Sequence, residues 1–208
     1  MRALLVALML TIGSQAGADE KCFAQPTLIR FYFEKAVHYF WPKANFNYPL
    51  HVVAEYKGPE EIKCLLNFYS DANLRDGSGN TALHYAAKSK RFDNVKFLLD
   101  VGADVNAYNY DKRVPLHDAA QYGASLKTVQ LLLDSGASVN SRIKWRNLTA
   151  LHFAAGCTDC QPGVIQALLN AGANHIGGIS GEPWLIAKDN PNLIGTDDYE
   201  ALSKDWGN

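Results

Sequence analysis

A short motif that ends in Leu-His recurs along this chain at nearly constant spacing. Its four histidines are His51, His84, His117 and His152, and they stand 33, 33 and 35 residues apart. A degraded fifth copy follows, with Leu185 in place of the histidine, 33 residues after His152. A period of this length predicts stacked units, because one unit cannot bury its apolar face alone.

A second apolar block follows each motif, and its spacing is that of an amphipathic helix. Each unit is therefore predicted to be a helix–turn–helix. Thr81 and Thr149 are placed to cap first helices, and Gly102 and Gly136 suit a left-handed end of the second helix. Tyr69 stands where these glycines stand, so we expect that turn to be distorted. The second blocks are residues 62–66, 95–99, 129–133 and 165–169.

The period and the Thr-Ala-Leu-His-x-Ala-Ala motif resemble the ankyrin repeat over residues 48–187. The resemblance implies an all-α solenoid of about five repeats with β-turn fingers. Residues 19–47 are expected to form an N-terminal capping segment, with a helix over residues 28–40. Residues 188–208 are expected to form a C-terminal capping helix that starts after Thr196 and carries Asp197 and Asp198 in its first turn.

The first 18 residues have the pattern of a secretory signal peptide. Arg2 precedes an apolar run over residues 4–12, and Ala16-Gly17-Ala18 suits cleavage before Asp19. A run this short does not reach the about 20 residues that span a bilayer, so no membrane insertion is expected. The pattern predicts a periplasmic or secreted protein, in an oxidising compartment where disulfides form.

Four cysteines are then expected to be paired. The favoured bridges are Cys157–Cys160 and Cys22–Cys64, although three pairings are possible. Cys157-x-x-Cys160 also has the spacing of a thiol-redox motif, which leaves a redox accessory protein as an alternative. A zinc site is disfavoured because a second CxxC or histidine pair is missing.

The sequence shows no catalytic constellation, and we expect a protein without enzymatic activity, metal or cofactor. Equivalent histidines of adjacent repeats lie about 8–10 Å apart, too far to share one ion. In ankyrin repeats such histidines bond to the backbone of a neighbouring turn. Asp118 is read as a lone acid in a helix. The net charge of −1 and pI of 6.6 argue against nucleic-acid binding.

What remains is a surface for binding another protein. The resemblance implies that finger tips and first helices line a concave groove that holds a partner, the chain itself being a monomer. Tyr, Trp and Arg are the residue types that dominate interface hot spots, and Trp145 is the expected anchor. Transferred by position, the groove residues are Arg75, Asn80, Lys88, Tyr108, Tyr110, Asp111, Lys112, Arg113, Gln121, Tyr122, Arg142, Lys144, Trp145 and Arg146.

The fingers are basic and aromatic while the chain as a whole is slightly acidic, so the partner is expected to present an acidic surface. The sequence thus predicts an exported, non-enzymatic protein-binding module. An inhibitor, an immunity-type protein or a scaffold of a bacterial periplasm fits this description. A secreted, host-directed effector is an alternative that differs in destination.

Overall fold

The computed structural model of the protein describes residues 48–69, 71–174 and 183–204, and every regular element in these ranges is an α-helix. The expected all-α fold is therefore confirmed. The signal peptide, the helix over residues 28–40, and Cys22 lie outside the described residues. The helices are α4 (Tyr48–Tyr56), α5 (Pro59–Tyr69), α6 (Ala82–Lys88), α7 (Phe92–Asp100), α8 (Pro115–Gln121), α9 (Leu126–Asp134), α10 (Ala150–Gly156), α11 (Val164–Asn170), α12 (Pro183–Ala187) and α13 (Asp197–Lys204).

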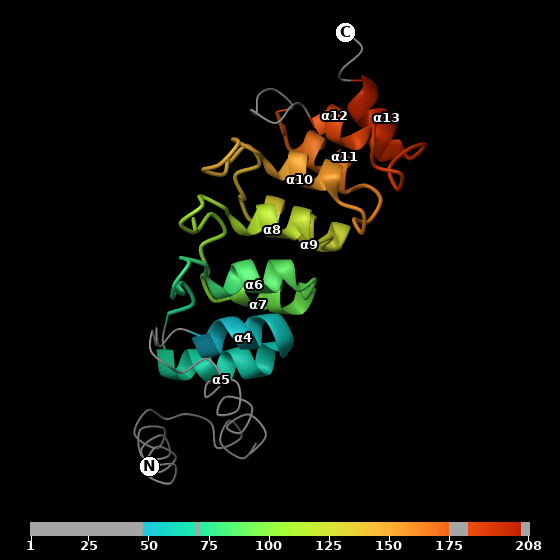
Figure 1. Ribbon diagram of the computed structural model, residues 1–208. Coiled ribbons are helices and arrows are strands. Elements are labelled where there is room, and N and C mark those ends of the chain that lie inside the picture. The colour runs from blue at the N-terminus through green and yellow to red at the C-terminus, as the bar shows by residue number, and fades with distance from the viewer. Residues whose placement is uncertain (1–47, 70, 175–182, 205–208) are drawn as a thin grey trace.

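The helices stack in two layers (Figure 1). The first helices of the repeats, α4, α6, α8, α10 and α12, each pack on the next, and the second helices, α5, α7, α9, α11 and α13, do the same. The described parts of the connections from α5 to α6, from α7 to α8 and from α9 to α10 project to the same side of the first helices, on the left in Figure 1. We call these projecting connections the fingers.

The core follows the repeat. The leucine before each motif histidine has no exposed surface. The small residues after the histidine, Ala-Ala in three repeats and Val53-Ala54 in the first, let neighbouring helices approach closely. Gly102 and Gly136 have φ of 90° and 87°, the left-handed conformation expected of them. The buried leucines are Leu50, Leu83, Leu116 and Leu151.

Tyr69, at the position of these glycines, is instead the last residue of α5, so that helix continues where the later ones have already ended. The turn that follows includes residue 70, which lies outside the described residues, so its expected distortion stays a prediction.

At the other end, α13 packs on both α11 and α12 and so completes a fifth helix pair. Asp198 is buried, and its carboxylate accepts hydrogen bonds from the backbone N–H groups of Gly163 and Gln166, at 2.8 and 3.1 Å. Asp198 therefore caps the neighbouring α11 in addition to lying in the first turn of its own helix. This bond ties the last unit to the array.

Asparagines join each repeat to the next. Asn106 donates to the carbonyl of Gly136 at 2.9 Å and accepts from the N–H of Ser138 at 2.7 Å. Asn73 and Asn140 make the equivalent pairs of bonds one repeat before and one repeat after. These side chains fix the register of the fingers. The sequence shows their recurrence but not this role.

Candidate functional site

The motif histidines attach each finger to the helices. His84 Nδ1 accepts the N–H of Thr81 at 3.1 Å, and Nε2 donates to the carbonyl of Arg113 at 3.2 Å in the next finger. His117 likewise accepts the N–H of Val114 and donates to the carbonyl of Ser141, at 3.0 and 2.9 Å. The expected backbone role of these histidines is confirmed. Burial lowers the pKa of His84, and it lowers the pKa of His117 to about 4.

Two side chains that the sequence did not single out shape the finger turns. Asp76 Oδ1 accepts the N–H groups of Ser78 and Asn80, at 2.8 and 2.9 Å. Asn109 Oδ1 accepts those of Asp111 and Arg113, both at 2.9 Å. Burial alone would raise the pKa of Asp76, but these bonds and one from the Tyr85 hydroxyl hold it below the usual value. Recurrence of Asp or Asn at this register was the signal available in the sequence.

The second and third fingers present an aromatic and basic surface, which we call the finger surface. Tyr110 and Trp145 are 68% and 64% exposed. The Lys144 ammonium lies 5.5 Å from the Trp145 ring centre, and the Lys144 N–H donates to the carbonyl of Asp111 at 2.7 Å, which joins the two fingers. The finger surface consists of Tyr108, Tyr110, Lys112, Arg142, Lys144, Trp145 and Arg146.

A hollow of about 180 Å³ lies beside the fingers, between α6 and α8, and we call it the groove hollow. Four residues predicted to bind a partner line it: Asn80, Lys88, Arg113 and Tyr122. Asn80 Oδ1 accepts a hydrogen bond from Asn109 at 2.8 Å, so that amide supports the finger. The Lys88 ammonium lies 5.2 Å from the centre of the Tyr122 ring and 3.9 Å from Glu55.

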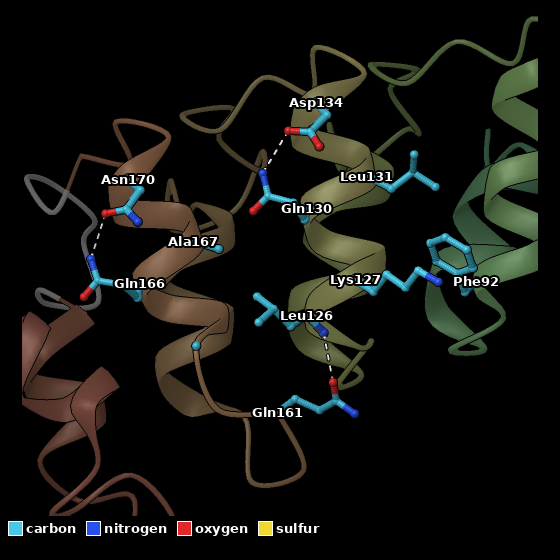
Figure 2. A pocket seen from close by; sticks show the side chains of 11 residues that line it. Phe92, Leu126, Lys127, Gln130, Leu131, Asp134, Gln161, Gln166, Ala167 and Asn170 are labelled. Atoms are coloured by element: carbon cyan, nitrogen blue, oxygen red, sulfur yellow. Dashed lines mark hydrogen bonds between the residues drawn. The ribbon is translucent and has the colours of Figure 1, made fainter.

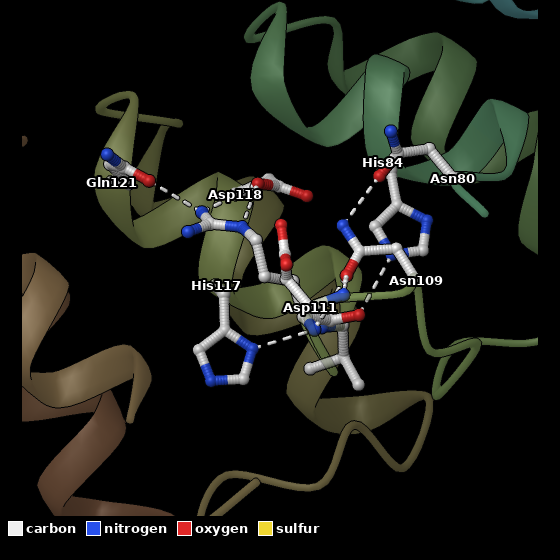
Figure 3. A network of polar contacts seen from close by, with 9 residues as sticks. Asn80, His84, Asn109, Asp111, His117, Asp118 and Gln121 are labelled. Carbon is white, nitrogen blue, oxygen red and sulfur yellow. Dashed lines mark hydrogen bonds and ion pairs between the residues drawn. The ribbon is translucent and has the colours of Figure 1, made fainter. Parts of the chain in front are cut away.

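Asp118, read from the sequence as a lone acid, is in fact paired. Arg113 Nε and Nη2 donate to its Oδ1 at 2.9 and 2.7 Å, and Nη2 also donates to Gln121 at 2.6 Å (Figure 3). The guanidinium further stacks 4.7 Å from the ring centre of Phe153 in the next repeat. Burial raises the pKa of Asp118, against the opposing charge of Arg113. Arg113 therefore supports the structure, in addition to any contact with a partner.

Arg75 has a comparable structural role. Its guanidinium donates to the carbonyls of Gly79 and Tyr108, which lie in successive fingers. Arg75 is nonetheless exposed, as are the four cations of the finger surface, whereas Lys88 and Arg113 are half-buried.

Comparison with known families identifies this architecture. Residues 28–109 match a model of ankyrin repeats in three copies, and residues 116–169 match a model of ankyrin repeats in many copies, together well over half of the chain. The chain belongs to the ankyrin repeat family. Ankyrin repeats indicate a protein–protein interaction module and are generally non-enzymatic. No curated protein matches the sequence closely enough to assign a specific function.

The ankyrin array holds the expected bridge between Cys157 and Cys160 in the loop from α10 to α11. The loop packs closely on the preceding repeat, since a Cβ on Gly123 would stand 2.8 Å from the Asp159 carbonyl oxygen. The predicted Cys22–Cys64 bridge involves a residue outside the described ranges and stays a prediction. Within those ranges no cluster of His, Cys, Asp or Glu could hold a metal ion, and no helix could span a membrane.

Replacing both Cys157 and Cys160 by serine is expected to lower the free energy of unfolding by about 2 kcal/mol. The bridge closes a loop with a sequence separation of only 3, for which the chain-entropy relation gives a small effect. Urea unfolding of the double variant measures it, with partner affinity expected to stay unchanged. A full loss of partner binding in a folded double variant would instead favour the redox alternative.

Another hollow of the ankyrin array lies on its other layer, along the second helices. It measures about 850 Å³, and Figure 2 shows its lining on α9, between α7 and α11. The Lys127 ammonium lies 4.2 Å from the ring centre of Phe92 at one edge. None of the predicted partner-binding residues lines this hollow.

Proposed function

We propose that the protein is exported and binds another protein through the finger surface and the groove beside it. The observation that carries this proposal is the exposure of Trp145 and Tyr110 among cations on two fingers that are joined by hydrogen bonds. Large aromatic side chains held in a fixed arrangement lose little entropy on binding, which is what a hot spot requires.

The partner is proposed to carry an acidic surface. Lys112, Arg142, Lys144 and Arg146 are exposed on the second and third fingers, against the two exposed carboxylates of Asp104 and Asp111. Complementary charge accelerates association, and added salt should slow it. An inhibitor, an immunity-type protein or a scaffold of a bacterial periplasm would use such a surface. A host-directed effector, secreted from the cell, would use it in the same way.

Replacing Trp145 by alanine is expected to weaken partner binding by at least about tenfold, because a desolvated aromatic contributes about 2 kcal/mol or more at a hot spot. The melting temperature should not fall, since the ring is 64% exposed. The partner is first obtained by affinity capture with residues 19–208 and mass spectrometry, and binding is then titrated. Ile194→Ala, at another exposed apolar residue, in the connection from α12 to α13 and so outside the fingers, is the matched control. A destabilised variant with unchanged affinity would contradict the proposal.

Export is tested on the protein itself. Cleavage after Ala18 should leave Asp19 as the first residue of the mature chain. Intact-mass measurement of the exported protein checks this expectation. A soluble chain that retains Met1 in the cytoplasm would contradict both the export proposal and the compartment in which a partner is sought.

A further inference from the structure

The groove hollow contains a hydrogen-bond acceptor that the fold does not use. Asp118 is 7% exposed, and both bonds from Arg113 go to the same oxygen, Oδ1. Within the described residues, Oδ2 receives no hydrogen bond, and Figure 3 shows it pointing away from the dashed contacts of Arg113. Within the described residues Oδ2 is not a fully buried atom: it keeps access to solvent in the hollow, where a hydrogen-bond donor of a ligand can reach it.

A hydrogen-bond donor stands across the same hollow. Lys88 lies on α6 and Asp118 on α8, and both line the hollow together with the tyrosine rings of Tyr85 and Tyr122. The Lys88 ammonium can donate hydrogen bonds to a ligand. Its carboxylate neighbour, Glu55, is 3.9 Å away, beyond hydrogen-bond distance, and its other contact is the face of the Tyr122 ring. The hollow thus offers one acceptor and one donor on opposite helices.

We propose that the groove hollow binds the carboxamide side chain of an asparagine or glutamine of the partner, an inference that rests on the proposed protein-binding function. A carboxamide has its donor and its acceptor on separate atoms, so its N–H group reaches Asp118 Oδ2 while its oxygen accepts from Lys88. The hollow's volume of about 180 Å³ has room for several water molecules, which such a side chain displaces.

Charged side chains fit this hollow less well. A carboxylate has no donor for Asp118 and meets its negative charge. A lysine or arginine meets the positive charges of Lys88 and Arg113, and Asp118 is already neutralised by the latter. A neutral amide satisfies both groups without adding charge beside the Arg113–Asp118 pair, and an apolar side chain leaves both groups without a bond to the ligand.

Three blocked peptides that differ at one residue test the proposal. They are acetyl-Gly-Gln-Gly-amide, acetyl-Gly-Glu-Gly-amide and acetyl-Gly-Ala-Gly-amide, titrated into the folded chain while backbone resonances of Lys88, Asp118 and Tyr122 are followed by NMR. The glutamine peptide should bind at least about fivefold more tightly than the other two, the gain expected from one net hydrogen bond. Because the main chain is shared, equal shifts from all three peptides would overturn the proposal.

Two variants separate recognition from folding. Asp118→Asn replaces the open acceptor by a donor and should abolish the preference for glutamine. Lys88→Met leaves the Arg113–Asp118 pair intact and should reduce the preference for the glutamine peptide. This variant tests the proposal even if Asp118→Asn does not fold. Lys112→Ala, on the finger surface, should change nothing. A preference that survives Lys88→Met and a folded Asp118→Asn would overturn the proposal.

The outcome also separates this inference from the proposed function. If a partner binds through Trp145 but no peptide shows a glutamine preference, the hollow has no amide site and the protein-binding function stands. If the glutamine preference is found and no protein partner depends on the finger surface, the amide site stands and the proposed function fails.

Discussion

The free energy of unfolding is expected to fall by about 3 kcal/mol between pH 7 and pH 4 through His117 alone. Burial lowers the pKa of His117 from 6.5 to about 4, so the unfolded chain binds a proton in this range while the folded chain does not. Stability is then fully present above pH 6.5 and is lost as the pH falls toward 4. His84, whose pKa burial also lowers, contributes in the same direction.

Asp118 acts in the opposite direction. Burial raises its pKa, so the folded chain binds a proton more readily than the unfolded chain, and this stabilises the fold as the pH falls. Between pH 6.5 and 5, the loss of stability through the two histidines should exceed the gain through Asp118. In this range the histidines of the unfolded chain take up protons, whereas an aspartate of the unfolded chain stays ionised.

Urea unfolding at pH 7, 6, 5 and 4 measures the effect, and His117→Gln is the variant that assigns it. Glutamine does not titrate, so the free energy of unfolding of the His117→Gln variant should change less with pH than that of the unmodified protein, even if the variant is less stable at every pH. An equally steep pH dependence in His117→Gln would show that the acid sensitivity arises elsewhere.

Replacing Arg113 by alanine is expected to destabilise the fold by about 3–5 kcal/mol, because it leaves the buried carboxylate of Asp118 without its counter-charge. The change also removes the bond to Gln121 and the stacking on Phe153 in the next repeat. Thermal and urea unfolding measure the loss.

Lys144→Ala is the matched control for Arg113→Ala, since Lys144 is a cation on the neighbouring finger whose side chain is exposed. Its removal should change stability by no more than about 0.5 kcal/mol. If the two variants unfolded at the same urea concentration, Arg113 would not be the structural residue that its contacts indicate.

The array of helices was predictable because its determinants are local and repeated. Apolar residues at helical spacing and the leucine of each motif recur at 33 to 35 residues, and the alanine pair and the glycine after the second helix recur in the later copies, so the copies support one another. The role of the motif histidines followed from the family, and the bridge between Cys157 and Cys160 from their spacing and the predicted compartment.

The polar contacts of the site were not predictable in the same way. Arg113, Lys144 and Arg146 are cations at comparable places in two fingers, yet Arg113 alone among them has a buried carboxylate within reach, together with an aromatic ring from the following repeat. Asp198 likewise caps a helix more than thirty residues away. Such partners depend on how neighbouring repeats are stacked, which no local pattern encodes.

By itself, then, the sequence determined the helices and their order, because hydrophobic periodicity and turn residues act within one repeat. The placement of the fingers beside the first helices followed from the resemblance to ankyrin repeats. Only the tertiary structure decided which polar side chains bond to other parts of the fold and which remain available to bind a partner. Burial makes an unpaired polar atom costly, so the side chains between repeats pair with one another first. What stays open to a partner is the finger surface and, in the groove hollow, one oxygen of Asp118.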